Sequence, residues 1–573
     1  MKQATSIVNA MLIGIMLAAL LALTGCSFDK AQQEAPREER VADQLAQAPK
    51  KDMDAGKTRQ RKVKRAEKKE ALKVVGALQE TAPSVAAPAP PAGRREAGDK
   101  GFNTEEYDKI NENQFKDARE NPLSTFSIDV DTASYTNVRR MLNSRHMPNK
   151  DAVRLEEMIN YFTYDYPQPT GKHPFSINTE IAACPWNDEH KLIHIGLQGK
   201  KLDYKDFKPS NLVLLVDSSG SMSAANKLPL LKQSLGLLLK ELDDRDRIAI
   251  VAYAGSAGLV LPSTPASKRE TILDALGSLS AGGSTAGGAG IQLAYKVAKE
   301  NLIEGGNNRV ILATDGDFNV GVSSSSDLVR LIEEKRKDDI FLTICGFGMG
   351  NYKDGRMEQI SNAGNGNYFY IDSAKEAEKV FVKEMRANMF TIAKDVKIQV
   401  EFNPTKVKAY RLVGYENRLL ANEDFDDDTK DAGELGAGHT VTALYEIIPA
   451  GSEEKVRTTG SLKYQETKIK NSAADSNEIM TLKFRYKPPK QDTSLLIQQT
   501  LNDSDTKAAK ASVNFRFSAS VAGFGMLLRD STFKNNLTYD HIAALAESSL
   551  GHDKEGYRQE FLQLINIARQ LSK

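Results

Sequence analysis

The chain has 573 residues, and its 77 basic and 76 acidic side chains leave a formal net charge of +1. A chain of this length is too long for one hydrophobic core, so we expect two to four domains. The balanced charge creates no global field that would attract nucleic acid, so no nucleic-acid partner is predicted.

The N-terminus has the features of a secretory signal peptide. Lys2 is followed by a mostly apolar run over 7–23 and by the sequence Leu-Thr-Gly-Cys, which ends at Cys26. This pattern predicts a signal peptide over 1–25. The last four residues resemble the bacterial lipobox, which implies a lipoprotein with Cys26 carrying acyl chains such as palmitate. Several chains would anchor the protein stably in the cell membrane or outer membrane, facing the periplasm or the cell surface. An uncleaved transmembrane anchor is the alternative.

Residues 26–101 are predicted to form a disordered tether. This segment contains a basic stretch over 57–73 and a Pro-Ala-rich stretch over 81–92, and it has few aromatic residues with which to build a core. The basic stretch is predicted to be a solvated, charged helix within the linker. Contact with anionic headgroups or lipopolysaccharide is the alternative, since each basic residue near such a surface contributes about 1 kcal/mol.

Residues 102–205 are predicted to form an N-terminal α+β module. Asp129 and Asp131 lie where its predicted strand meets its first helix. A metal site is one interpretation of this pair, but carboxylates at a strand end and a helix start, favoured by the helix dipole, are the preferred one. The predicted elements are a strand, two helices and a hairpin that carries the only tryptophan, Trp186: 123–131, 133–142, 151–162 and 181–198.

Residues 206–389 alternate between strands and helices, the pattern of an α/β domain with a doubly wound, mostly parallel, Rossmann-like sheet. Leucines recur at helical spacing along 227–242, which predicts a stripe that faces the core. The predicted strands are 212–216, 247–253, 309–314, 340–346 and 367–371. The predicted helices are 227–242, 268–279, 288–301, 324–337, 355–362 and 374–389.

Residues 390–573 are predicted to form a C-terminal mixed α+β module, rich in strands and closed by helices. Its acidic stretch over 424–431 lacks the glycine and the glutamate of an EF-hand loop, so a solvated loop is preferred over a Ca²⁺ site. Cys345 lies in an apolar run, so Cys345 and Cys184 are predicted to be separate buried thiols rather than a disulfide. The predicted strands are 395–402, 407–413, 440–448, 461–464 and 479–486, and the helices are 514–529, 539–548 and 555–570.

Oxygen-bearing side chains follow the apolar strand 212–216. Asp217, Ser219 and Ser221 alternate along the chain, so on an extended or looping backbone they point the same way. The carboxyl end of a parallel strand is where open α/β sheets place ligands, and a Gly-rich loop over 282–288 and Asp315, which follows another strand, belong to the same edge. Hard oxygen ligands suit Mg²⁺ or Mn²⁺ and do not suit Zn²⁺.

Five side chains from three loops resemble the metal-ion-dependent adhesion site (MIDAS) of von Willebrand factor type A (vWA) domains: Asp217, Ser219, Ser221, Thr285 and Asp315. The resemblance implies that the hydroxyls bind the metal directly or nearly so, and that the carboxylates hold it directly or through water. The family's Thr-x-x-Gly spacing favours Thr285 over Ser284. The resemblance also implies that the bound ion is Mg²⁺ (or Mn²⁺ or Ca²⁺) and that a partner protein supplies an Asp or Glu to it.

The flanking regions are similar to those of bacterial vWA lipoproteins, with 121–165 resembling their N-terminal module and the region after 389 their C-terminal domain of unknown function. The predicted function is a lipid-anchored cell-envelope protein that binds a partner protein through the metal. A metal-assisted hydrolase and a structural envelope protein with a stabilising metal are the alternatives. The chain has no HExxH or GxSxG motif, and none of its seven histidines lies in the three loops, so no enzymatic activity is predicted.

Overall fold

The computed structural model describes residues 105–573, apart from 286, 317–324, 351, 459, 461–462 and 465–466. These residues fall within one compact unit, Asp99–Lys573. The predicted signal peptide, Cys26 and the tether up to residue 101 lie outside the described residues. Within the described ranges, no helix is long and apolar enough to cross a membrane.

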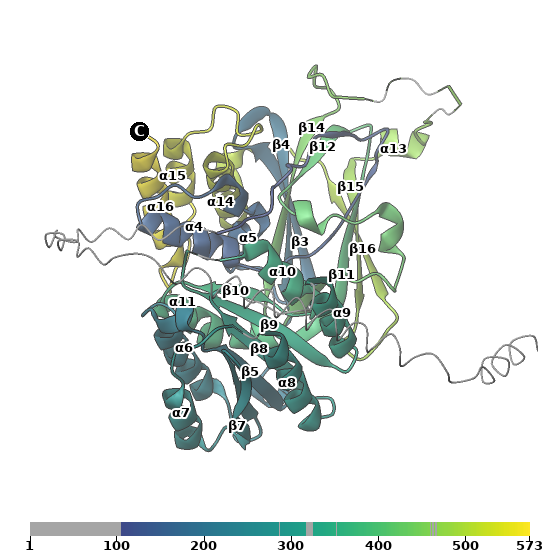
Figure 1. Ribbon diagram of the computed structural model, residues 1–573. Helices are drawn as coiled ribbons and strands as arrows, with labels where there is room; N and C mark the ends of the chain where they lie inside the picture. Colours follow the sequence, from purple (N-terminus) through teal and green to yellow (C-terminus); the bar gives the residue numbers. More distant parts are fainter. Residues whose placement is uncertain are drawn as a thin grey trace, which may run out of the picture. The chain divides into compact units, whose positions relative to one another are not determined.

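A six-stranded, mostly parallel sheet forms the centre of residues 206–389 (Figure 1). Its strands are β5 (Ser210–Asp217), β6 (Arg247–Tyr253), β7 (Ala257–Pro265), β8 (Asn307–Thr314), β9 (Ile340–Phe347) and β10 (Tyr368–Ile371). They lie in the order β10-β9-β8-β5-β6-β7, and β7 runs antiparallel to β6. The five predicted strands are confirmed. The sequence does not predict β7, because this edge strand is half exposed and lacks a continuous apolar run.

Helices cover both faces of this sheet (Figure 1): α6 (Leu228–Glu241), α7 (Arg269–Ser278), α8 (Gly287–Glu300), α9 (Ser325–Arg336) and α10 (Asp354–Ala363). Leu214 of β5 packs in one core with the leucines of α6, as predicted for that stripe, and with α7. Its neighbour Leu215 packs on the other face with α8, α9 and α10. Because successive residues of β5 face opposite layers, both must be apolar, which explains the uninterrupted apolar run.

The prediction of one continuous helix over 374–389 is wrong. Helix α11 (Ala374–Glu378) passes into a π-helical turn, η4 (Lys379–Lys383), and α12 (Met385–Met389) follows. The amide of Glu384 donates to the carbonyl of Lys379, five residues earlier, at 2.8 Å. Such a turn takes in one extra residue, which apolar spacing along the sequence does not reveal.

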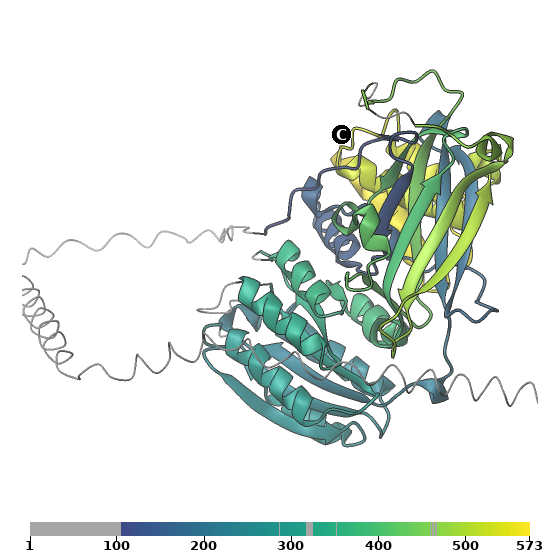
Figure 2. The ribbon, with the colours of Figure 1, turned by 90° about the vertical axis from the view of Figure 1, so that its right-hand side faces the viewer.

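The segments on either side of this domain share two antiparallel sheets, which Figure 2 shows facing each other. The strands of the first are β1 (Lys116–Asp117), β12 (Val407–Val413), β14 (Thr440–Pro449), β4 (Asn187–Gly199) and β3 (Phe175–Cys184), in that order. The second has β13 (Gly433–Gly436), β11 (Thr391–Phe402), β15 (Glu478–Lys487) and β16 (Leu495–Asn502), with β2 (Leu123–Ser127) also paired to β11. The N-terminal and C-terminal segments, expected to form one module each, therefore complete each other's sheets.

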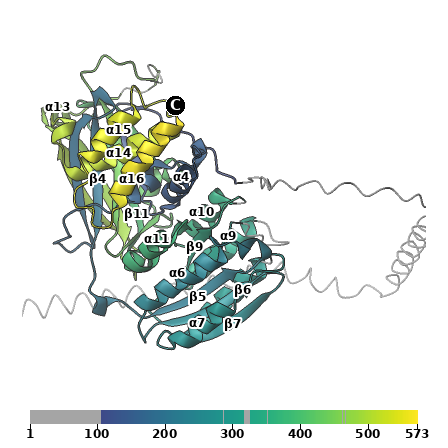
Figure 3. The same ribbon diagram turned by 90° about the vertical axis from the view of Figure 1, so that its left-hand side faces the viewer.

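Helices from both segments cover the outer face of the first sheet (Figure 3). They are α4 (Ala133–Asn143), α5 (Leu155–Asn160), α14 (Val513–Leu528), α15 (Tyr539–Glu547) and α16 (Tyr557–Leu571). Helix α14 is buried on nearly all sides, and Trp186, in the predicted hairpin, packs in the same core. Short elements complete the described part of the chain: η1 (Lys150–Ala152), η2 (Tyr204–Asp206), η3 (Gly220–Ser223), η5 (Glu416–Arg418), η6 (Asn422–Phe425), α13 (Asn471–Asp475) and η7 (Ala508–Lys510).

Two smaller predictions can be compared with the structure. Cys184 and Cys345 are free and buried, as predicted. The predicted strand over 461–464 falls partly outside the described residues, and Lys463 and Tyr464 form a bend.

Asp129 and Asp131 pair with Arg418. The Nη2 atom of Arg418 lies 2.8 Å from Oδ1 of Asp129 and 3.2 Å from Oδ2 of Asp131. Asp131 also accepts a hydrogen bond from the backbone amide of Tyr368, in β10, at 2.8 Å. A guanidinium therefore supplies the positive charge that a metal would have supplied. The sequence could not indicate this partner, because Arg418 lies 287 residues from Asp131.

Two buried arginines join the helices near the N-terminus to the six-stranded sheet domain. Nη2 of Arg139, on α4, lies 2.5 Å from Oδ1 of Asp372 and 2.8 Å from Oε2 of Glu376. Nη2 of Arg154 lies 2.9 Å from Oε2 of Glu358, on α10. Burial raises the pKa values of both glutamates, and the arginines oppose this shift. The junction is therefore ionic as well as apolar.

Candidate metal centre

Asp217 ends β5 at the carboxyl edge of the parallel sheet, and its side chain is fully buried. Its Oδ1 accepts a hydrogen bond from the amide of Ser219 at 2.9 Å. Its Oδ2 accepts hydrogen bonds from the hydroxyls of Tyr253 and Thr314, both at 3.2 Å. Burial raises the pKa of Asp217, the hydrogen bonds from Ser219 and Tyr253 oppose this rise, and the negative charge of Asp315 adds to it. A cation near both carboxylates would relieve their repulsion.

The two serines lie in the turn that follows β5. Their Oγ atoms are 3.0 Å apart, within hydrogen-bond distance. Ser219 is buried, whereas Ser221 is exposed. One hydroxyl-bearing residue of the pair is therefore enclosed by protein, and the other faces solvent.

Backbone hydrogen bonds hold the Gly-rich loop against this turn. The amide of Gly282 donates to the carbonyl of Ser218 at 2.8 Å, and the amide of Gly220 donates to the carbonyl of Gly283 at 3.1 Å. Thr285 is half-buried. Among the described residues, the hydrogen bonds that join the loop to the turn involve Gly282 and Gly283 rather than Thr285. The structure thus brings the loop to the turn through its glycines, with no hydrogen bond from the Thr285 side chain among the described residues.

Asp315 follows β8, the neighbour of β5, and is almost fully buried. Its Oδ2 accepts a hydrogen bond from Nζ of Lys227 at 2.8 Å. Its Oδ1 is buried and has no hydrogen-bond partner within the described part of the chain. A buried carboxylate oxygen without a partner is costly. A bound cation would satisfy this oxygen.

Three side chains that hydrogen-bond to the two aspartates were not predicted from the sequence: Tyr253, Thr314 and Lys227. Tyr253 ends β6 in register with Asp217, and Thr314 directly precedes Asp315. Burial and the charge of Asp217 raise the pKa of Tyr253 well above its usual range, so its phenol stays protonated and donates. Tyr253 and Thr314 could have been predicted, because they end the two strands that flank β5. Lys227 immediately precedes α6, and its sequence context resembles that of any solvated lysine.

The side chains in this crevice suit a hard divalent cation, because their ligand atoms are carboxylate and hydroxyl oxygens. Asp217 and Asp315 carry the negative charge, and the serines carry neutral oxygens. The described residues hold no group of three or more His, Cys, Asp or Glu side chains placed to bind a metal. The candidate centre is of a different kind, since it combines two carboxylates with hydroxyls.

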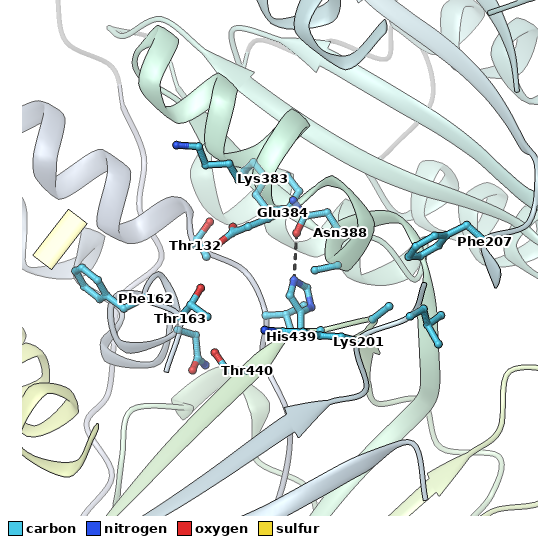
Figure 4. A pocket seen from close by; sticks show the side chains of 17 residues that line it. Thr132, Phe162, Thr163, Lys201, Phe207, Lys383, Glu384, Asn388, His439 and Thr440 are labelled. Carbon is cyan, nitrogen blue, oxygen red and sulfur yellow. Dashed lines mark hydrogen bonds between the residues drawn. The ribbon is translucent and has the colours of Figure 1, made fainter. Parts of the chain in front are cut away.

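A cavity of about 360 Å³ lies elsewhere, between α12 and the turn before β14 (Figure 4). His439 and Asn388 face each other across it, with His439 Nε2 lying 3.1 Å from Asn388 Oδ1. Burial lowers the pKa of His439 to about 4, so the ring is neutral at physiological pH. Lys201, Glu384 and Phe207 also line the cavity, and its lining shares no residue with the candidate metal centre.

Three stretches of the chain match known families. Residues 211–383 match the von Willebrand factor type A domain, 101–194 match the family described as von Willebrand factor, and 387–571 match the family described as "Uncharacterized protein YfbK, C-terminal". The helix-covered parallel sheet and the match over 211–383 define a protein with a vWA domain.

The chain is 42% identical over 472 residues to the uncharacterized protein YfbK of Escherichia coli strain K12, covering 81% of each chain. It therefore belongs to the family of YfbK-like vWA proteins. It is also 30% identical over 149 residues to human inter-alpha-trypsin inhibitor heavy chain H4, which is 24% of this chain and 16% of that protein. A solved von Willebrand factor type A structure from Catenulispora acidiphila covers 70% of this chain and 92% of its own, with 17% identity and a TM-score of 0.37.

Proposed function

We propose that the vWA domain binds a partner protein through a divalent cation held by five side chains: Asp217, Ser219, Ser221, Thr285 and Asp315. The observation that carries the proposal is the buried Oδ1 atom of Asp315, which has no hydrogen-bond partner among the described residues and lies on the same sheet edge as the buried carboxylate of Asp217. Mg²⁺ is the preferred ion because the ligand atoms are hard oxygens, and Mn²⁺ or Ca²⁺ are the alternatives.

The charges of these residues favour the binding of an outside carboxylate. Asp217 and Asp315 balance the charge of the cation, while the serine and threonine oxygens are neutral. When bound, the cation would offer an open coordination position to a carboxylate from outside. Ser221 is exposed, so an Asp or Glu of the partner would approach the cation from its side.

Capture of a partner should require both the metal and Asp217. The full-length protein, used as bait in envelope extract, should retain its partner in Mg²⁺ and lose it in EDTA. Asp217→Asn should lose the partner in both buffers, because it removes a buried charge that balances the cation. Asp274→Asn, which changes an exposed carboxylate on α7, should behave as the wild type does. Equal capture in Mg²⁺ and EDTA would contradict the proposal, and an Asp217→Asn protein that does not fold would favour a purely structural metal.

The same proposal places the protein on a membrane through lipidated Cys26. Cys26→Ser should move the protein from the membrane fraction to the soluble fraction, because the acyl chains supply the stable anchor. Cys345→Ala, which changes a buried thiol in β9, is the matched control and should stay with the membranes. Immunoblots of separated membrane and soluble fractions measure the difference. A Cys26→Ser protein that still sediments with membranes would rule out this anchor.

A further inference from the structure

The ammonium of Lys227 pairs with a carboxylate of the candidate metal centre. Its Nζ atom is 2.8 Å from Oδ2 of Asp315, and the two side chains are only 13% and 2% exposed. Lys227 stands at the start of α6, where its carbonyl accepts a hydrogen bond from the amide of Leu231 at 2.8 Å. The lysine is therefore presented to the carboxylate by the first turn of a helix.

The loop after β9 leaves room for this lysine. Gly348 has a φ of +78°, and a Cβ atom placed on it would lie 2.2 Å from Cε of Lys227 and 2.6 Å from its Cγ. A side chain at position 348 would therefore displace the stem of Lys227, and only glycine suits both the backbone conformation and the close approach. The position of the Lys227 side chain is thus fixed in part by its packing against the segment that follows β9.

Charge decides what this arrangement can do. Asp217 and Asp315 together carry two negative charges, and Lys227 supplies one positive charge. A divalent cation added while Lys227 keeps its contact would place two positive groups on the same buried carboxylate, where screening by solvent is weak. The ammonium and the metal are therefore alternative counter-ions for Asp315.

The geometry points to Lys227 as an internal counter-ion that holds the metal-free centre and lowers its affinity for the metal. This inference rests on the proposed function. An acidic partner would favour the state in which the metal is bound. In that state the metal and the displaced ammonium carry three positive charges together. The two aspartates and one carboxylate of the partner carry three negative charges, so the charges balance. Lys227 would thereby couple metal loading to the arrival of a carboxylate.

Calorimetric titration of the full-length protein with Mg²⁺ and with Mn²⁺ tests this role. Lys227→Met should bind either ion more tightly than the wild type by about tenfold or more, because the competing charge is gone. Lys227→Gln, which can still donate a hydrogen bond to Asp315, should also bind more tightly, and it serves if the methionine variant does not fold. Lys240→Met changes an exposed lysine on the same helix and should match the wild type.

The outcomes separate the two proposals. If the wild type binds metal but the Lys227 variants bind it equally or more weakly, Lys227 positions Asp315 and the counter-ion role is overturned. If neither the wild type nor any Lys227 variant binds Mg²⁺ or Mn²⁺, the metal centre itself is wrong. Binding that appears only in the Lys227 variants would support the inference.

Discussion

Replacing Asp315 with alanine is expected to weaken Mg²⁺ binding by more than about 100-fold, since the loss of an outer-shell partner alone costs roughly 10- to 100-fold. The change removes one of two buried carboxylates and leaves the ammonium of Lys227 in the crevice without its counter-ion. Both effects oppose the binding of a cation. Isothermal titration calorimetry of the full-length protein measures the affinity.

Two comparisons make this result specific. Asp315→Asn keeps the shape of the side chain but removes its charge, so it should lose most of the affinity as well. Asp274→Asn, on the exposed side of α7, should bind Mg²⁺ as the wild type does. Circular dichroism should show unchanged secondary structure for Asp315→Ala, because Asp315 follows the end of β8 rather than lying within it. An unchanged Mg²⁺ affinity in Asp315→Ala would refute the assignment of this site.

Arg139→Met should lower the free energy of unfolding by about 3–5 kcal/mol, the usual cost of removing one partner from a buried ion pair. The guanidinium contacts Asp372 through two hydrogen bonds, of 2.8 and 2.5 Å, and Glu376 through a third of 2.8 Å. Methionine fills a similar volume but leaves both carboxylates buried without their cation. The junction between α4 and the vWA domain should therefore open at a lower urea concentration.

The fluorescence of Trp186 can follow this transition, because it is the only tryptophan and is buried in the core beneath α14. Arg330→Met is the matched control, since Arg330 is exposed on α9 and its ion pair with Asp327 is long, at 3.8 Å. Its effect should stay within about 0.5 kcal/mol. A loss below about 1 kcal/mol in Arg139→Met would contradict the expected role of this buried ion pair.

Much of the candidate centre could be predicted from the sequence because its signals are local. An apolar run that ends in Asp217, followed by hydroxyls at alternate positions, needs no distant partner to be recognised. The same holds for Asp315 after the apolar strand β8. Lys227 could not be predicted, since its contact depends on the side-by-side packing of β5 and β8 and on the close approach of Gly348.

The edge strands show a second reason why prediction fails. β16 pairs on one side with β15 and alternates between exposed and half-exposed residues, so it carries little of the apolar pattern that marks a core strand. The strands of the vWA sheet that are covered on both faces carry the full pattern and were all predictable.

The sequence by itself determined the α/β class, the strands that lead into the crevice and the residues at their ends, because each depends on neighbours a few positions away. Only the tertiary structure decided how distant segments combine. β2 pairs with β11, β4 pairs with β14, and Arg139 reaches across to Asp372. Strand edges accept any partner of suitable length, and charged side chains pair with whichever opposite charge the packing brings near. Such contacts are therefore settled by the folded chain as a whole.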